Sequence, residues 1–169
     1  MIRTRAAGAG DIESINQVFY NFWRSAYRGI IADHYLDRLP ADHWCEFLEQ
    51  GLKDHRMFIL VLEREVQIIG AAVLSPAERD GVVHLISFYI RPEEIGTGLG
   101  HIFYQDIEAE ARKRGYTGCV LDVLKSNQRA ARFYHLHGFH LTGKTTEAAL
   151  GERIYTCDIW EKDLPGNST

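Results

Sequence analysis

A glycine-rich turn is the feature that most constrains how this chain folds. Gly96, Gly98 and Gly100 follow an apolar run that closes near residue 90, and they lead directly into an amphipathic helical pattern. Glycine lacks a Cβ atom and tolerates positive φ, so such a turn directs successive N–H groups into one space. The helix start behind the turn adds partial positive charge. The pattern is typical of a phosphate site, although a tight strand-to-helix connection explains the turn equally well when it is taken alone.

Length and composition are those of a globular domain. The chain has 169 residues, of which 46% are hydrophobic and 25% are charged. This is enough for one well-packed core but short for two domains. We expect one domain over residues 1–162 and a frayed tail over residues 163–169. Cys45, Cys119 and Cys157 lie in apolar patterns without metal-ligand spacing, so we expect them in the core and expect no metal.

Charge and hydropathy exclude several classes of partner. The formal net charge is −4 and the isoelectric point is near 6.0, which is not the basic excess of a nucleic-acid-binding protein. The N-terminal residues show no signal-peptide pattern, and no run approaches the roughly 18 apolar residues of a membrane span. We therefore expect a cytoplasmic protein without a nucleic acid or membrane partner.

Hydrophobic periodicity predicts the elements before the glycine turn. Asp11 is a candidate N-cap, and Pro40 interrupts a helical pattern, which splits it into two short helices. The predicted elements are a strand at 2–6, a helix at 12–26, two short helices within 33–53, a hairpin of strands at 57–62 and 66–74, and a strand at 82–90.

The elements after the turn alternate between helix and strand. They are a helix from residue 99 that ends before Gly115, a strand at 119–124, a helix capped by Asn127 that runs to residue 137, and a closing hairpin of strands at 139–144 and 153–160. Because a helix separates the strands at 82–90 and 119–124, we expect these two strands to run parallel.

Two common nucleotide-binding motifs do not fit the glycine turn. The Walker pattern needs a Gly-Lys-Ser/Thr ending that is absent here, and the dinucleotide fingerprint would need glycine where His101 stands. Asp122 is at a suitable distance for a ribose contact, but it lies inside a predicted strand rather than at its end. The sequence therefore supports neither a Walker motif nor a dinucleotide-binding motif at this turn.

Two longer segments identify a family resemblance. Tyr89-Ile90-Arg91-Pro92 runs into the glycine turn, and Leu121-Asp122-Val123 leads to Asn127 and on to Phe139. In their order and spacing, residues 84–103 and 118–139 closely resemble the GNAT superfamily of acetyl-coenzyme A dependent N-acetyltransferases. The resemblance implies an α/β fold of the α+β type, in which two central parallel strands splay apart within a mixed, mostly antiparallel sheet of six or seven strands flanked by about four helices.

The resemblance also implies a binding site for acetyl-CoA. The exposed edge of residues 88–90 would pair with the pantetheine arm, and the glycine turn would hold the pyrophosphate. Ile95 departs from the family pattern, which has Gln or Arg at this position, so one side-chain contact to phosphate is in doubt. The residues expected to bind the coenzyme are Phe88, Tyr89, Ile90, Ile95, Gly96, Thr97, Gly98, Leu99, Gly100, His101, Asn127, Arg129, Ala130, Arg132 and Tyr134.

Two side chains are candidates for proton transfer. Tyr134 occupies the family position of a tyrosine that protonates the departing thiolate, and a phenol suits that task because its basicity is close to that of a thiolate. Its alternative role is packing beside Phe133. His84 lies near the place where the family positions a base for the amine, and imidazole is a usable base near neutral pH. A purely structural strand histidine is the alternative, and Asp122 on the neighbouring strand is a less favoured candidate for the base.

The acceptor is not identified by the sequence. We expect acetyl transfer to a primary amine in a ternary complex, with a small amine favoured over a protein, by a monomer or homodimer. The alternatives are protein acetylation and a catalytically silent acyl-CoA-binding module. Aromatic and acidic residues that could receive a cationic amine are Tyr20, Trp23, Tyr27, Tyr35, Trp44, Asp33, Asp37 and Glu147. Core packing and ordinary surface explain them equally well.

Overall fold

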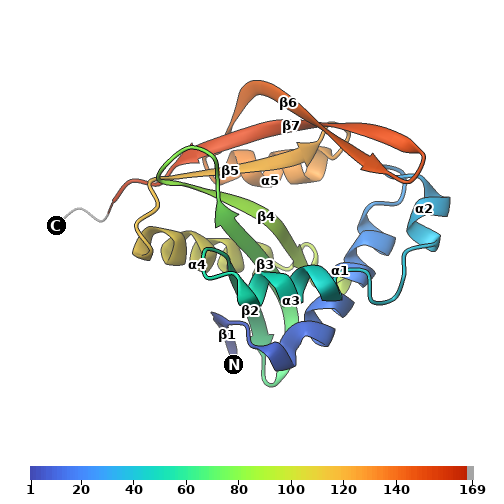
Figure 1. Ribbon diagram of the computed structural model, residues 1–169, viewed down its shortest axis with the longest axis horizontal. Coiled ribbons are helices and arrows are strands. Elements are labelled where there is room, and N and C mark those ends of the chain that lie inside the picture. Colours follow the sequence, from blue (N-terminus) through green and yellow to red (C-terminus); the bar gives the residue numbers. More distant parts are fainter. Residues whose placement is uncertain (167–169) are drawn as a thin grey trace.

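The protein folds around one seven-stranded sheet, as a computed structural model that describes residues 1–166 shows (Figure 1). The strand order is β1-β2-β3-β4-β5-β7-β6. The strands are β1 (Ile2–Ala6), β2 (Phe58–Arg64), β3 (Gln67–Pro76), β4 (Val82–Ile90), β5 (Gly118–Leu124), β6 (His140–Leu150) and β7 (Arg153–Asp163). The α-helices are α1 (Ile12–Ala26), α2 (Asp33–Asp37), α3 (Cys45–Lys53), α4 (Leu99–Lys113) and α5 (Gln128–Leu136), and the 3-10 turns are η1 (Ala9–Asp11) and η2 (Pro92–Glu94).

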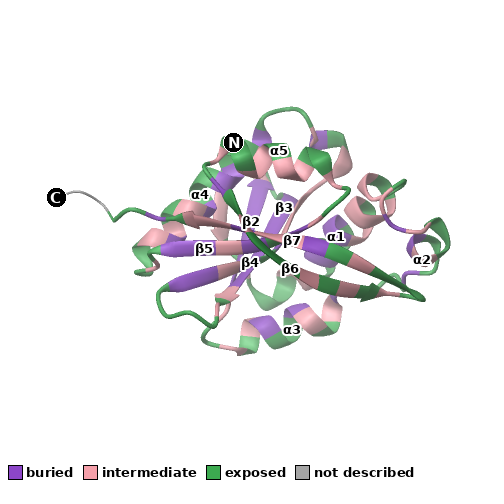
Figure 2. Cartoon of the chain, turned by 90° about the horizontal axis from the view of Figure 1, so that it is seen from above, coloured by how far each residue is buried: buried purple, intermediate pink, exposed green. Residues whose placement is uncertain are grey.

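Helices cover both faces of the sheet. Alternate strand residues point to opposite faces, so Leu60 and Leu62 of β2 pack in the core beneath α4 and α5, while Ile59 and Val61 pack in the core beneath α1 and α3. Figure 2 shows the buried strands with α4 and α5 on one side and α3 on the other. This double burial explains why β2 and β3 read as nearly continuous apolar runs.

The sheet is divided by a split between its two parallel strands. Every other neighbouring pair of strands is antiparallel, whereas β4 and β5 run parallel. They pair at three positions, the last of which is His84 with Val120. Beyond this point β4 continues to Ile90 and β5 to Leu124 without pairing to each other. The expected splay of the two central strands is confirmed.

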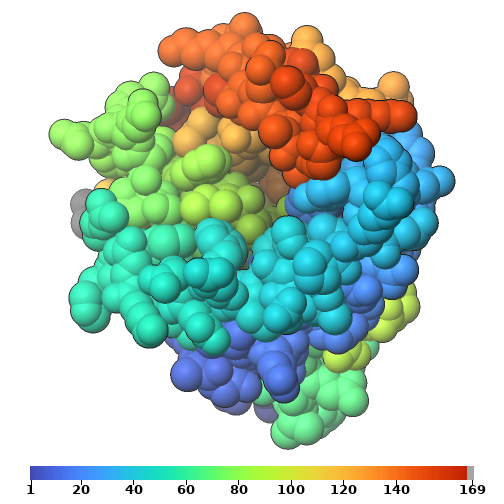
Figure 3. Space-filling model, turned by 45° about the vertical axis from the view of Figure 1, so that its right-hand side comes forward, coloured from blue at the N-terminus to red at the C-terminus, as the bar shows by residue number. Residues whose placement is uncertain are grey.

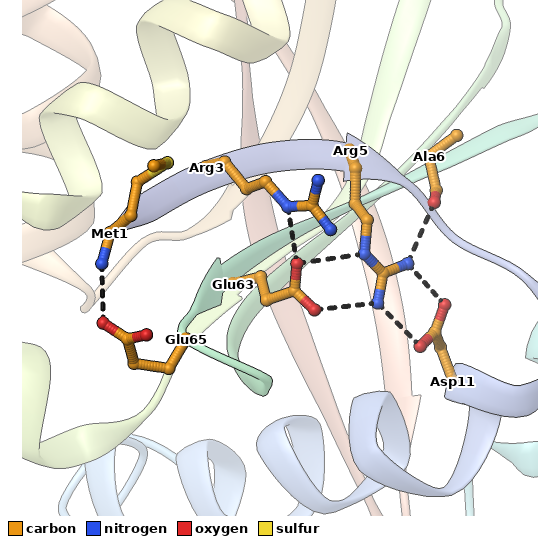
Figure 4. A network of polar contacts seen from close by, with 7 residues as sticks. All are labelled: Met1, Arg3, Arg5, Ala6, Asp11, Glu63 and Glu65. Atoms are coloured by element: carbon orange, nitrogen blue, oxygen red, sulfur yellow. Dashed lines mark hydrogen bonds and ion pairs between the residues drawn. The ribbon is translucent and has the colours of Figure 1, made fainter.

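A charged network ties the N-terminal strand to the sheet. Arg5 lies between two carboxylates, with its Nη1 2.8 Å from Asp11 Oδ2 and its Nε 3.3 Å from Glu63 Oε2 (Figure 4). Arg3 Nε donates to Glu63 Oε2 at 2.8 Å. The Asp11 side chain makes no cap bond to α1 and instead accepts from the Gly8 N–H. The predicted N-cap therefore stands at the helix start but uses its carboxylate to hold β1.

The closing hairpin is longer than predicted. The predicted strand at 139–144 extends through Leu150, because pairing with β7 overrides the helix-favouring residues Glu147, Ala148 and Ala149. At the start of the predicted tail, Asp163 belongs to β7, and Leu164 is buried with its N–H donating to Thr117 O. Residues 167–169 of the predicted frayed tail lie outside the described residues.

Smaller differences concern helices and cysteines. Five α-helices flank the sheet within residues 1–166, rather than about four, because the interrupted pattern after α1 forms both of its predicted short helices. Cys119 and Cys157 are buried as expected, whereas Cys45 is only half-buried at the start of α3. None of the helices in the described part of the chain is both long and apolar enough to cross a membrane.

Candidate active site

A large cavity occupies the split in the sheet. Its volume is about 710 Å³, within the usual range for sites that hold a small organic ligand. The unpaired parts of β4 and β5 line it, together with residues of the turn before α4, of α5, of α1 and of the hairpin of β6 and β7. Figure 3 shows the surface hollowed between the orange β6–β7 hairpin, the blue segment that follows α1, and the green β4 region.

The glycine turn presents free N–H groups at one end of the cavity. Gly96 and Gly98 both have positive φ, at 86° and 89°, and Gly98 is the N-cap of α4. Thr97 Oγ1 accepts from the Leu99 N–H at 3.4 Å. Within residues 1–166, no acceptor lies in hydrogen-bond geometry for the N–H groups of Gly98, Gly100 and His101. These donors and the start of α4 form a site for an anion.

The start of α5 faces the same end. Asn127 caps this helix, because its Oδ1 accepts from the Ala130 N–H at 3.2 Å. Arg129 and Arg132, one turn apart, are exposed and line the cavity. They add positive charge beside the glycine turn. His101 is stacked on Phe133, with ring centroids 4.7 Å apart, and this contact joins the first turn of α4 to α5.

Tyr134 lies where the two halves of the sheet separate. Its ring packs against Phe139 at 5.4 Å and faces Phe88 of β4 at 6.5 Å, and the residue lines the cavity. Burial raises the pKa of Tyr134 well above the ordinary value of 10.0, with a smaller contribution from the charge of Tyr89. The phenol is therefore held in its protonated form, which is the form that can donate a proton.

The strand histidine stands beside a carboxylate that reaches the cavity. His84 is the last residue of β4 that pairs with β5, and it is not among the described residues that line the cavity. Asp122 of β5 does line it, and its Oδ1 is 3.9 Å from His84 Nε2. Both side chains are about one-third exposed. A proton accepted at Asp122 therefore has an imidazole close by.

Part of the cavity lining is aromatic and aliphatic. We call it the aromatic wall and define it by Phe22, Trp23, Tyr27, Tyr89, Ala148 and Leu150. Phe22 and Tyr89 have ring centroids 4.8 Å apart, as have Trp23 and Tyr27. Burial raises the pKa values of Tyr27 and Tyr89, so both phenols stay neutral. Ala148 and Leu150 are two residues apart on β6 and therefore point to the same side.

Most of the predicted coenzyme residues come together at this cavity. Its lining contains Phe88, Tyr89, Ile90, Ile95, Gly96, Gly98, Gly100, His101, Asn127, Arg129, Ala130, Arg132 and Tyr134. Thr97 and Leu99 are not among the described lining residues, because Thr97 bonds within its own turn and the Leu99 side chain is buried in the core beneath α4.

The predicted acceptor residues are placed differently. Trp23 and Tyr27 line the cavity, whereas Trp44 is buried in the core and Glu147 is exposed on β6. Phe22, Ala148, Leu150 and Cys157 were missed as site residues. The alternating half-buried pattern at 146, 148 and 150 depends on the longer β6, so the sequence signal appears only once that strand is recognised.

Comparison with known proteins agrees with this geometry. Residues 16–139 match the model of the acetyltransferase (GNAT) family. An uncharacterized N-acetyltransferase of Schizosaccharomyces pombe is 30% identical over 93 residues, which is 55% of each chain. An uncharacterized N-acetyltransferase of Mycobacterium tuberculosis is 35% identical over 95 residues, which is 56% of this chain and 60% of that protein. The aligned region thus spans somewhat more than half the length of these curated relatives.

Solved structures share the fold. The PaiA N-acetyltransferase of Thermoplasma acidophilum, solved in complex with coenzyme A, has a TM-score of 0.79 at 20% identity and is matched over 96% of this chain and 99% of its own. The YncA acetyltransferase of Salmonella typhimurium, solved with acetyl-CoA, has a TM-score of 0.73 at 20% identity, over 100% and 97% of the two chains. A spermidine N(1)-acetyltransferase of Thermoplasma acidophilum is 20% identical over 163 residues, 91% of this chain and 98% of its own.

The family model covers most of the chain and includes both the glycine turn and the split strands. The chain belongs to the acetyltransferase (GNAT) family.

Proposed function

We propose that this protein transfers the acetyl group of acetyl-CoA to a primary amine by direct attack in a ternary complex. The observation that carries the proposal is one cavity that joins three features: an anion site at the glycine turn, unpaired strand edges, and the aromatic wall. A coenzyme and an acceptor that both bind in this cavity would meet in the split. Membership of the family and the coenzyme-bound structures that share the fold support this reading.

The proposed coenzyme position follows from the donors in the cavity. The pyrophosphate would accept hydrogen bonds from the N–H groups of Gly98, Gly100 and His101, with Arg129 and Arg132 supplying positive charge. The two amide units of the pantetheine arm would pair with the unpaired edge of β4, which runs six residues from Ile90 back to Leu85. Six residues of strand correspond to about 20 Å. The thioester would then lie near the head of the split.

The reacting groups are then within reach of two proton-transfer residues. The amine nitrogen attacks the thioester carbonyl carbon, the new C–N bond forms, and the C–S bond breaks as the tetrahedral intermediate collapses. Tyr134 Oη donates its proton to the departing thiolate sulfur. The proton lost by the amine passes to Asp122, with His84 as the base beside it. In this proposal His84 acts through Asp122 rather than touching the amine.

The direct test is release of coenzyme A thiol from acetyl-CoA in the presence of amines. The panel should include spermidine, the acceptor in the name of the Thermoplasma relative, together with small monoamines and a peptide. We expect saturable release that depends on both substrates. Saturable binding of acetyl-CoA without release from any amine would instead favour a catalytically silent acyl-CoA-binding module, for which Ile95 at the usual Gln or Arg position is the early sign. Mass spectrometry of the products distinguishes protein acetylation from small-molecule acetylation.

A further inference from the structure

One carboxylate beside the glycine turn is buried. Glu94, the last residue of η2, is 8% exposed, and of residues 92–98 it alone is buried. Arg64, at the end of β2, meets it with both arms of its guanidinium group: Nη1 is 2.5 Å from Glu94 Oε1, and Nη2 is 3.2 Å from Oε2. A carboxylate that is removed from water needs such a partner. Within residues 1–166, Arg64 is the only cationic side chain paired with Glu94.

The backbone of Glu94 holds the glycine turn. Its carbonyl oxygen accepts from the Thr97 N–H at 3.2 Å and from Thr97 Oγ1 at 2.6 Å. The first of these bonds closes a β-turn in which Ile95 has φ −65° and ψ 130° and Gly96 has φ 86°, the angles of a type II turn. Thr97 Oγ1 in turn accepts from the Leu99 N–H at 3.4 Å. The turn before α4 therefore closes on Glu94.

The ion pair lies outside the cavity. Neither Arg64 nor Glu94 is among the described residues that line it, so the pair can act on a ligand there only through the turn. Before the turn, the chain is fixed by the Arg91 N–H, which donates to Ile69 O at 2.8 Å. After the turn, it is fixed by Leu99, whose side chain is buried in the core. Between these two points, the Arg64–Glu94 pair ties the turn to the end of β2.

We propose that Glu94, held by Arg64, is a positioning residue for the coenzyme. The ion pair fixes the turn so that the free N–H groups of Gly98, Gly100 and His101 are in place before the pyrophosphate arrives. This inference rests on the proposed function, because it takes the coenzyme position given there. A buried ion pair adds little to stability on average, but its hydrogen bonds favour one arrangement of the groups that they join. A turn that is fixed in advance spares the ligand the cost of ordering it.

The charge of Glu94 distinguishes this role from a direct electrostatic effect. Glu93 and Glu94 both lie in η2, just before the proposed phosphate site. A negative charge that acts only through space repels phosphate, so removing either carboxylate should then strengthen coenzyme binding. Positioning predicts the opposite sign for Glu94. Glu93, which is exposed in the same 3-10 turn, is therefore the matched control.

The first experiment measures the Kd for coenzyme A by calorimetric titration. The variants are Glu94→Gln, which keeps the size of the side chain and removes its charge, Arg64→Gln, the double variant, and Glu93→Gln. We expect each single variant of the pair to bind coenzyme A about tenfold more weakly than the wild type, the scale of one charge-assisted hydrogen bond. The double variant should match the single variants, because all three lose the same interaction. Glu93→Gln should bind as tightly as the wild type or more tightly.

The second experiment uses an acetyl donor that has no pyrophosphate. S-acetylpantetheine contains the thioester and the pantetheine arm of acetyl-CoA, and thiol release with a reactive amine is the measurement. We expect Glu94→Gln to lower kcat/KM for acetyl-CoA about tenfold, in line with its Kd, and to leave kcat/KM for S-acetylpantetheine near the wild-type value. With acetyl-CoA, the change should appear in KM rather than in kcat, because the bound thioester reacts in the same split. A merely structural role would affect both donors alike.

Two results overturn the inference. One is an affinity for coenzyme A in Glu94→Gln that equals or exceeds that of the wild type, and the other is an equal fall in kcat/KM for both donors. Melting curves check that each variant is folded at the assay temperature. If Glu94→Gln does not fold, Arg64→Lys keeps the positive charge at a position that is 42% exposed but loses the planar fork, and it should also weaken coenzyme binding.

Failure of the proposed function gives a different result. In that case the wild-type protein releases no thiol from acetyl-CoA with any amine. The titration with coenzyme A still tests the positioning role of Glu94, because it does not depend on turnover.

Discussion

At the scale of single residues, Tyr134 carries the clearest prediction. Burial raises the pKa of its phenol and keeps it protonated. Phenylalanine at this position would keep the ring that packs against Phe139 and would remove only the hydroxyl group. We expect Tyr134→Phe to lower kcat by about tenfold to a thousandfold, the usual size of a general-acid contribution, with little change in the Kd for acetyl-CoA. Steady-state kinetics and calorimetric binding measure the two quantities.

The matched control for this variant is Tyr116→Phe. Tyr116 is half-buried and packs against the Phe58 ring at 6.5 Å, away from the cavity lining. Because Tyr116→Phe removes one hydroxyl group away from the cavity, we expect its kcat to stay within about twofold of the wild type. Wild-type turnover in Tyr134→Phe would remove Tyr134 from the chemical step.

Residues differ in how well the sequence predicts their place in the site. Tyr134 and Asn127 lie within one local motif on one helix, so the motif predicts their relative position. His84 and Asp122 lie on different strands, and their distance from the cavity depends on where β4 and β5 stop pairing. That point is set by tertiary packing, which is why the sequence favours His84 over Asp122 as the base, whereas the structure has Asp122 and not His84 among the described lining residues.

At the scale of elements, substitutions at two glycines of the turn distinguish the effect of backbone strain from the effect of lost ligand contact. Gly98 has a φ of 89°, so Gly98→Val strains the turn whatever binds there. A Cβ at Gly100 would meet Phe133 at 3.5 Å, an ordinary contact that the free protein tolerates. We therefore expect Gly100→Ala to keep the wild-type melting temperature and acetyl-CoA affinity. Gly100→Val should weaken acetyl-CoA binding about tenfold, because its two further methyl groups extend beyond that contact at the proposed phosphate site.

Thermal melting and calorimetric titration test these variants. Gly10→Ala is the control, because a Cβ there meets nothing within 4 Å and its φ is not positive. Undiminished acetyl-CoA affinity in Gly100→Val and in Gly98→Val would mean that the pyrophosphate is held elsewhere.

The network between β1, β2 and η1 predicts how acid affects stability. Hydrogen bonds from Arg3 and Arg5 lower the pKa of Glu63 from 4.5, and a hydrogen bond from Arg5 lowers that of Asp11 from 3.8. In the unfolded chain both carboxyl groups have their ordinary pKa values. The ionised carboxylates therefore contribute their full stabilisation of the fold above the ordinary pKa values, and this contribution is lost as the pH falls through the lowered pKa values of the folded state. We expect Glu63→Gln to melt at a lower temperature than the wild type at pH 7, and the difference to shrink between about pH 5 and pH 3.

Melting curves across this pH range provide the measurement, with Glu93→Gln as a control on an exposed position of η2. A difference between wild type and Glu63→Gln that stays constant with pH would show that Glu63 does not contribute through its charge.

The elements themselves were largely predictable, for identifiable reasons. The helices α1 and α4 show clear apolar periodicity, and α5 has its Asn127 cap. The second half of β6 was missed because Glu147, Ala148 and Ala149 favour helix, and only the pairing with β7 makes them a strand. Ala148 and Leu150 of the aromatic wall belong to that half of β6, so this part of the lining, which the sequence could not predict, is built by long-range strand pairing.

At the scale of the whole molecule, the split makes the coenzyme a structural partner. One half of the sheet contains β1 to β4, the other contains β5, β7 and β6, and three residue pairs of β4 with β5 join their edges. A ligand that pairs with the free edge of β4 and contacts α5 would bridge the two halves. Binding to the folded state alone stabilises a protein in proportion to the logarithm of ligand concentration.

We therefore expect coenzyme A at 100 times its Kd to stabilise the protein by about 2.7 kcal/mol, which raises the melting temperature by roughly 5–10 °C for a chain of this size. Hydrogen exchange should slow at the unpaired residues 85–90 of β4 and 121–124 of β5. Pantetheine and adenosine 3′,5′-bisphosphate each supply only part of the bridge and should bind more weakly, so each should give a smaller melting shift than coenzyme A at the same concentration. A melting shift without slower exchange at β4 would place the coenzyme outside the split and contradict the bridging role.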